Sequence, residues 1–278
     1  MRTEYLIGLT PAGFHRFAVH LWGDETETVP TICVHGLTRT GRDFDYLAPV
    51  LAVDREVACP DVVGRGQSNR LRDPTHYTNW QYAMDMTAVM ASIGDREVDW
   101  VGTSMGGLIG MIVAAQPGNP IRRLVLNDVG PFISAEAIDE IGARLRQPVH
   151  PDQASIRTAL RESLAEWGEL PEGAFDHLAA FSEIERPDGS WERSYDPAIA
   201  EPFKNQDIGS VDLWPLWEAI TCPVLVIRGA HSKVLSAETA ARMAERDGVD
   251  LVEIAGCGHA PSLMTDDQIT LVRDWLDA

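Results

Sequence analysis

The chain alternates short apolar, β-branched runs with longer stretches in which apolar residues recur at helical spacing. The runs that predict strands cover residues 31–34, 55–61, 98–102, 123–127, 223–227 and 249–254. Strands that alternate with helices are typical of an α/β protein with an open parallel sheet and helices on both of its faces. Each run ends in polar or glycine-rich residues. Because the carboxyl ends of the strands form the ligand-binding edge of such a sheet, we expect the chemistry there.

Residues 131–215 lack this strand pattern and are acidic and helical in character. We therefore predict a helical cap over 131–215, inserted into an α/β core formed by 1–130 and 216–278. The apolar and aromatic residues of the cap form its own core, or some of them line a substrate pocket. They include Ile156, Leu160, Leu164, Trp167, Phe175, Phe181, Trp191 and Phe203.

Composition narrows the classes of function. The 278 residues are 45% hydrophobic, which suffices for one large domain or two small ones. Lys and Arg total 23 against 42 Asp and Glu, a net charge of −19, so nucleic acid and anionic membranes are poor partners. No apolar run reaches the roughly 18 residues of a membrane helix, and the first residues lack the order of a secretory signal. We expect a cytoplasmic monomer or homodimer.

The cysteines give no evidence of a metal site. Cys33, Cys59, Cys222 and Cys257 are scattered, with no C-x-x-C spacing, and three of them lie in or beside apolar strand-like runs. Reduced thiols in the core are expected in preference to disulfides or zinc ligands.

The strongest chemical motif surrounds Ser104. A predicted strand runs into Gly-Thr-Ser-Met-Gly at residues 102–106, and a helical stretch follows. A serine at such a tight strand-to-helix turn is raised above the sheet edge, and Gly102 and Gly106 are needed where strand and helix approach too closely for a Cβ atom. The amino end of the helix then favours negative charge on a bound acyl oxygen.

A serine hydroxyl needs a general base, and His259 is the candidate. It follows the last predicted strand, in the glycine-rich run Gly-Cys-Gly-His at residues 256–259. Of the other histidines, His35 also ends a predicted strand. We assign His35 to bracing its loop by hydrogen bonds rather than to acid–base work.

The loop that begins His35-Gly36-Leu37 supplies a second expected feature, a backbone N–H group facing the nucleophile. We predict an oxyanion hole formed by the amides of Leu37 and Met105, with His35 and Gly36 as supporting residues.

Together these motifs resemble the α/β-hydrolase fold, in its cap-bearing branch of esterases, lactonases and C–C hydrolases. The matching segments are residues 34–37 (Val-His-Gly-Leu), 61–68 (Asp-Val-Val-Gly-Arg-Gly-Gln-Ser), 102–107 (Gly-Thr-Ser-Met-Gly-Gly), 126–131 (Leu-Asn-Asp-Val-Gly-Pro), 228–229 (Arg-Gly) and 256–259 (Gly-Cys-Gly-His). The resemblance implies a mostly parallel central sheet flanked by helices, with a helical cap inserted after the sixth strand. It also implies a serine hydrolase with Ser104 as nucleophile and His259 as base, and with neither metal nor organic cofactor. In the family, residues 61–68 form a structural turn near the oxyanion loop, and we assign Arg65 as a brace there rather than a substrate clamp.

The acidic member of the triad departs from the family pattern. It usually follows the strand at 223–227 in a Gly-x-x-Ser-Asp-like loop, but this chain has Lys233 at the position of the carboxylate. Asp128, after the strand at 123–127, is the substitute, because relatives such as haloalkane dehalogenases carry their acid there and triads are defined by geometry. The alternative is that Asp128 only orients the cap entry loop by accepting backbone N–H bonds. Lys233 is expected to be solvated or paired with a carboxylate.

The sequence thus favours a hydrolase of small to medium carboxylic esters that works through an acyl-enzyme on Ser104. A carbon–carbon bond or lactone hydrolase would use the same residues. A catalytically weakened homologue that binds a small molecule is a third hypothesis, and Lys233 is its best support. Epoxide hydrolase and dehalogenase activities are disfavoured, since those enzymes have an aspartate where Ser104 stands.

Overall fold

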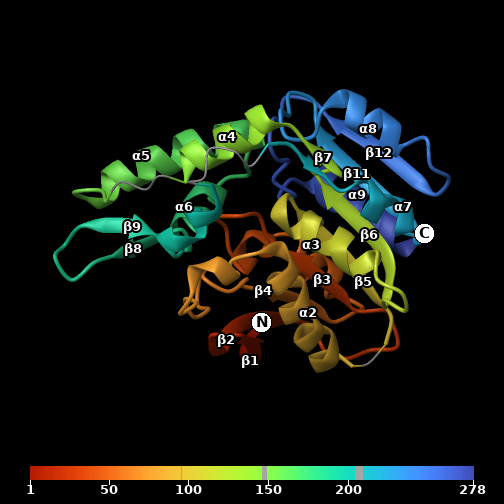
Figure 1. Ribbon diagram of the computed structural model, residues 1–278, viewed down its shortest axis with the longest axis horizontal. Coiled ribbons are helices and arrows are strands. Elements are labelled where there is room, and N and C mark those ends of the chain that lie inside the picture. The colour runs from red at the N-terminus through yellow and green to blue at the C-terminus, as the bar shows by residue number, and fades with distance from the viewer. Residues whose placement is uncertain (95, 146–148, 204–208) are drawn as a thin grey trace.

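An eight-stranded sheet crosses the molecule in the order β1-β2-β4-β3-β5-β6-β11-β12 (Figure 1). The computed structural model describes residues 1–94, 96–145, 149–203 and 209–278. The strands of the sheet are β1 (Arg2–Thr10), β2 (Gly13–Trp22), β3 (Thr31–Val34), β4 (Val57–Pro60), β5 (Val98–Thr103), β6 (Ile121–Asn127), β11 (Val224–Gly229) and β12 (Val249–Ile254).

The strands from β4 to β12 pair in parallel, as predicted, and the expected strands are all present. The antiparallel hairpin of β1 and β2 was not predicted. Its edge strand β1 exposes Tyr5, Ile7 and Leu9 on the solvent side, so it lacks the apolar-in, polar-out alternation by which a half-buried strand is detected.

Helices cover both faces of the sheet, because neighbouring residues of the central strands point to opposite sides. Trp100, Leu124 and Val226 pack in one apolar cluster with residues of α2, α3, α7 and α8. Val101, Val125 and Leu225 pack in another with residues of α1 and α9. The core helices are α1 (Ala48–Leu51), α2 (Asn79–Ser92), α3 (Met105–Ala114), α7 (Trp214–Ala219), α8 (Ala237–Met243) and α9 (Asp266–Asp277), with 3-10 turns η1 (Gly41–Phe44) and η2 (Pro74–His76). The α/β-hydrolase architecture expected from the sequence is confirmed.

Much of the segment between β6 and β11 extends away from the sheet, on the left of Figure 1, whereas α7 of the same segment packs on the sheet. The segment contains α4 (Ala135–Arg144), α5 (Gln153–Ser163), η3 (Ala165–Trp167), α6 (Ala174–Ala180) and η4 (Pro197–Phe203). It also contains the short strands β7 (Phe132–Ile133), β8 (Glu183–Glu185), β9 (Trp191–Arg193) and β10 (Val211–Asp212). These short strands were not predicted; they form two antiparallel pairs and are too short for a periodic pattern. The division into a core and a cap with boundaries at 131 and 215 stays a prediction.

The apolar residues of α5 and η3 form a core of the inserted segment. Leu160, Leu164 and Trp167 are buried together with Leu178 of α6. Met264, from the loop before α9, belongs to the same cluster. For these residues the interpretation as core is confirmed, and the cluster joins the inserted segment to the loop that carries His259.

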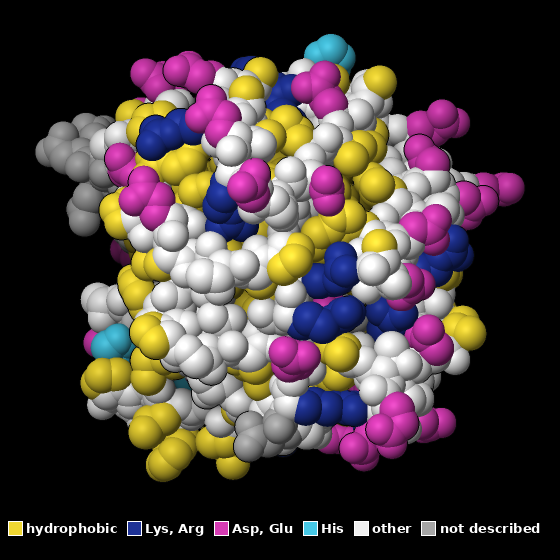
Figure 2. All heavy atoms as spheres, turned by 90° about the vertical axis from the view of Figure 1, so that its right-hand side faces the viewer, with side chains coloured by type: hydrophobic (Ala, Val, Ile, Leu, Met, Phe, Trp, Pro, Cys, Tyr) yellow, Lys and Arg dark blue, Asp and Glu magenta, His cyan; other side chains and the backbone are white. Residues whose placement is uncertain are grey.

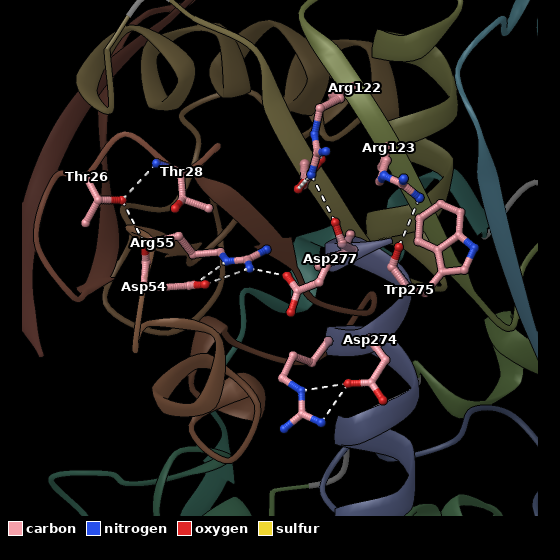
Figure 3. Close-up of polar contacts among 12 residues, drawn as sticks. Thr26, Thr28, Asp54, Arg55, Arg122, Arg123, Asp274, Trp275 and Asp277 are labelled. Carbon is pink, nitrogen blue, oxygen red and sulfur yellow. Dashed lines mark hydrogen bonds and ion pairs between the residues drawn. The ribbon is translucent and has the colours of Figure 1, made fainter.

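Three arginines hold the carboxyl end of helix α9 (Figure 3). Arg122 donates to the Leu276 carbonyl at 3.1 Å and Arg123 to the Trp275 carbonyl at 3.0 Å, while Arg55 pairs with Asp277. These contacts hold the carboxyl end of α9, the end farther from the loop of His259.

Acidic residues dominate the composition but are mixed with basic ones on the surface. On the face in Figure 2, the described arginine and lysine side chains lie among acidic ones and do not form a separate basic surface. Within the described ranges, the helices are all too short or too polar to cross a membrane. The four cysteines are free thiols.

Candidate active site

Ser104 lies at the turn between β5 and α3. Its φ of 52° and ψ of −113° are unusual for a residue with a side chain, and such conformations persist only where surrounding contacts hold them. The Ser104 N–H donates to the Asn127 carbonyl of β6 at 2.9 Å. Its carbonyl accepts from the N–H groups of Gly107 and Leu108 in the first turn of α3. The turn therefore fixes the hydroxyl at the carboxyl edge of the sheet, and the residue is partly exposed.

Two glycines make this turn possible, as the sequence predicted. A Cβ atom on Gly102 would lie 2.4 Å from the carbonyl carbon and oxygen of Gly106. One on Gly106 would lie 1.9 Å from the Val34 carbonyl oxygen of β3. Both contacts are with backbone atoms, which cannot rotate away, so alanine at either position would push strand and helix apart.

Ser104, His259 and Asp128 are joined by hydrogen bonds, although 155 positions of sequence separate the first pair. His259 Nε2 lies 2.8 Å from Ser104 Oγ, and His259 Nδ1 lies 2.7 Å from Asp128 Oδ2. The His259 side chain is 18% exposed and the Asp128 side chain is fully buried. With a proton on Nδ1 directed at Asp128, the Nε2 lone pair is free to accept the Ser104 proton.

Asp128 accepts three hydrogen bonds. Its Oδ1 accepts from the Gly229 N–H at 2.8 Å, and its Oδ2 accepts from the Ser232 hydroxyl at 2.6 Å as well as facing His259. The backbone of Asp128 has a φ of 59°, a left-handed value that Asp tolerates better than most residues. Asp128 thus contacts the imidazole, and the backbone N–H that it accepts is that of Gly229 at the end of β11 rather than one of the cap entry loop, where the alternative hypothesis placed it.

The loop after β3 lies beside Ser104. A Cβ atom on Gly36 would be 3.8 Å from Ser104 Cβ and 3.7 Å from Arg39 Cγ. Arg65 holds this loop by a hydrogen bond, since its Nε donates to the Leu37 carbonyl at 2.8 Å. The same guanidinium donates to the Val63 carbonyl and lies 3.6 Å from the Met105 sulfur. Arg65 is 1% exposed, so it braces the loop as expected and has no access to a substrate.

His35 is a second brace of the loop. Its Nε2 accepts from the Val62 N–H at 2.9 Å, so its Nδ1 carries the proton and donates to the Gly36 carbonyl at 2.7 Å. Burial lowers the pKa of His35 to about 4, despite opposing contributions from the Gly36 carbonyl and Asp61. The ring is therefore neutral at pH 7 and connects the loop after β3 to the turn at residues 61–68.

Comparison with known proteins places this geometry in a family. The family model of the alpha/beta hydrolase fold matches residues 29–264. The chain belongs to the α/β hydrolase family. This α/β hydrolase is 42% identical to a 3-hydroxybutyrate-oligomer hydrolase of Cupriavidus necator, over 97% of this chain and 96% of the relative.

Solved structures of similar chains have the same fold. A putative hydrolase from Rickettsia typhi superposes with a TM-score of 0.91 at 33% identity, covering 100% of this chain and 99% of that one. An α/β hydrolase from Novosphingobium aromaticivorans gives a TM-score of 0.86 at 35% identity, covering 99% of this chain and 98% of that one.

Lys233 of this α/β hydrolase pairs with a surface carboxylate. Its side chain is 69% exposed and its Nζ lies 3.1 Å from a carboxylate oxygen of Glu140 on α4. The expected pairing with a carboxylate is confirmed. The preceding residue, Ser232, faces inward to Asp128, so the loop after β11 still contributes to the site through its serine.

Three contacts of the hydrolase were missed in the sequence. Ser232 matches the serine of the family's Gly-x-x-Ser loop, a signal that the departure at Lys233 obscured. Asn127 donates through its side-chain amide to the Pro261 carbonyl at 2.8 Å and so connects β6 to the loop of His259. Glu166 of η3 accepts the Gly258 N–H on its carbonyl at 2.6 Å. A backbone contact of this kind has no sequence pattern.

Proposed function

We propose that this hydrolase cleaves carboxylic esters of small to medium size through an acyl-enzyme on Ser104. The observation that carries the proposal is the continuous hydrogen-bond chain from Ser104 through His259 to Asp128, with separations of 2.8 and 2.7 Å. These are ordinary distances for a nucleophile, its general base and the group that orients the base.

In the proposed reaction, the Ser104 hydroxyl attacks the ester carbonyl as His259 Nε2 takes its proton. Asp128 stabilises the imidazolium and keeps the ring in the tautomer that has a free Nε2. The imidazolium returns the proton to the leaving alkoxide, which departs as an alcohol. A water molecule, deprotonated by His259, then attacks the acyl carbonyl, and Ser104 is released with its proton.

The amides of Leu37 and Met105 are proposed to hold the oxyanion. Met105 is the first residue of α3, where an N–H has no carbonyl partner one turn earlier in the helix. Leu37 would supply the second N–H of the oxyanion hole, and Arg65 restrains this residue by donating to its carbonyl. Removing one such donor typically costs about 3 kcal/mol of transition-state stabilisation.

For the substrate, we propose esters between short hydroxy-acid units. The support is the 42% identity, across nearly the whole of both chains, to a hydrolase named for 3-hydroxybutyrate oligomers. The hypothesis of a weakened binding homologue loses its main support, since Lys233 pairs with Glu140 while Asp128 contacts the imidazole. Hydrolysis of carbon–carbon bonds or lactones remains an alternative outcome of substrate assays.

The test compares the wild type with Ser104→Ala on 4-nitrophenyl butyrate and on 3-hydroxybutyrate oligomers. We expect a burst of about one 4-nitrophenol per active site in the wild type and a loss of at least about 10⁴-fold in kcat in the variant. Ser92→Ala, at the exposed end of α2, is the matched control and should keep wild-type rates. Turnover by Ser104→Ala at a rate similar to the wild type would contradict the acyl-enzyme.

A further inference from the structure

Arg193, at the end of β9, is a half-buried cation without a partner among the described residues. Its Nε is buried and has no hydrogen-bond partner. Within the described parts of the chain, its guanidinium makes neither an ion pair nor a hydrogen bond, while the residue as a whole keeps partial exposure. Withdrawing an unpaired charge from water costs free energy, and a bound anion would offset this cost by supplying the missing counter-charge.

The neighbouring charges do not neutralise Arg193. Asp43 is occupied by Arg39, which donates to both of its carboxylate oxygens at 2.6 and 2.8 Å. Burial, aided by the charge of Arg39, lowers the pKa of Arg193 to about 10, so the guanidinium is still protonated at pH 7. Burial also raises the pKa of Tyr195 to about 12, so this neighbour is a neutral phenol and supplies no counter-charge.

The segment of Arg193 is bonded to the oxyanion loop through Arg39. The Ser194 N–H donates to the Ser182 carbonyl at 2.9 Å, and the Ser182 hydroxyl accepts from Arg39 Nη1 at 2.7 Å. Arg39 and Ser104 flank the same glycine, Gly36.

The same segment is bonded to the turn that braces the loop. Tyr195 forms a β-bridge with Arg65, and the Gly66 N–H donates to the Ser194 carbonyl at 2.9 Å. Arg65 in turn holds the Leu37 carbonyl. Two sets of contacts, through Arg39 and through Arg65, therefore connect the segment of the unpaired cation to the loop beside Ser104.

We propose that Arg193 binds a free carboxylate of the substrate and makes the enzyme selective for esters whose alcohol part ends in a carboxylate. This inference rests on the proposed function. A guanidinium and a carboxylate form two parallel charge-assisted hydrogen bonds, which provide both affinity and orientation. An oligomer of a hydroxy acid has one free carboxylate, at the end whose hydroxyl is esterified, so Arg193 would present the ester bond nearest that end to Ser104.

The experiment compares the linear dimer of 3-hydroxybutyrate with its methyl ester, following cleavage of the internal ester by chromatography. We expect the wild type to prefer the free acid, and Arg193→Gln to lower kcat/KM for the free acid by about 10- to 100-fold, mainly through KM. The variant should leave the methyl ester and 4-nitrophenyl butyrate unchanged, and Arg193→Lys should recover part of the preference. Arg186→Gln removes an exposed cation of the same hairpin and is the matched control.

An inhibition assay tests carboxylate binding by Arg193 without using the dimer as substrate. Free 3-hydroxybutyrate should inhibit 4-nitrophenyl butyrate hydrolysis competitively in the wild type, and its Ki should rise by about 10- to 100-fold in Arg193→Gln. Equal Ki values, or equal losses on charged and neutral esters, would overturn the role of Arg193 and leave the acyl-enzyme intact. Failure of the acyl-enzyme itself would be seen separately, as the absence of a burst with 4-nitrophenyl butyrate.

Discussion

Replacing Asp128 by Asn tests the central contact of the site with almost no change of shape. Oδ1 accepts from the Gly229 N–H, a group that only donates, so the amide oxygen of Asn takes this position. The amide nitrogen then faces His259 Nδ1, in the position of Oδ2. Because that nitrogen is a donor, Nδ1 must accept, and the imidazole proton moves to Nε2.

The moved proton removes the general base. Nε2, 2.8 Å from Ser104 Oγ, would then carry a hydrogen and could not accept the serine proton. The loss of the correct tautomer and of the carboxylate charge is expected to lower kcat by about 10⁴-fold, equivalent to about 5.5 kcal/mol in the barrier. The Ser232 hydroxyl can rotate to accept from the new amide, so stability should fall by only about 1–3 kcal/mol.

The assay is the steady-state hydrolysis of 4-nitrophenyl butyrate at pH 7, with urea unfolding of each variant to verify folding. Asp176→Asn is the control, since its side chain is 76% exposed and it should keep wild-type kcat. A folded Asp128→Asn enzyme that loses less than about tenfold in kcat would refute the assignment of Asp128 as the orienting acid.

Three further substitutions, at two positions, test the His35 brace and the departure from the family pattern at Lys233. Burial lowers the pKa of His35 to about 4 from 6.5, so below pH 6.5 the unfolded chain binds a proton that the native one does not. The stability advantage of the wild type over His35→Gln should therefore shrink by about 3 kcal/mol as the pH falls from 7 to 4, and a gap in urea unfolding that stays constant would count against a neutral buried ring. Lys233→Ala removes an exposed pair with Glu140 and should change kcat less than twofold and stability by about 1 kcal/mol or less. Lys233→Asp should not restore turnover to Asp128→Asn, and recovery of activity would show that this position reaches the imidazole after all.

Local chemistry explains why parts of the site were predictable. The turn at Ser104 needs glycine at positions 102 and 106 because a Cβ atom there would overlap backbone atoms, and this requirement is visible as Gly-x-Ser-x-Gly. Strands β3, β4, β5 and β11 were predictable because they are buried almost throughout and so consist largely of apolar residues, and the half-exposed edge strand β12 was predictable from its β-branched residues. His259 was predictable because it directly follows the last of these strands.

Other features depend on contacts between distant segments and have no local pattern. Chain order alone left two roles open for Asp128, and the tertiary structure brings its carboxylate to the imidazole through the packing of β6 beside β11. Arg193 is an ordinary arginine in the sequence. It becomes a half-buried cation without a described partner only when its hairpin packs beside the loop after β3, where Arg39 already occupies the nearby carboxylate of Asp43.

Six strands of the sheet, the strained serine turn and the candidate base could thus be inferred from residue order, because steric exclusion and burial act on neighbouring residues and leave an apolar or glycine-marked pattern. The acid that contacts the base, the partner of Lys233 and the lack of a counter-charge at Arg193 emerge only in the folded chain. Those properties depend on distances between side chains far apart in the chain, and electrostatic pairing and burial are set by these distances rather than by residue order.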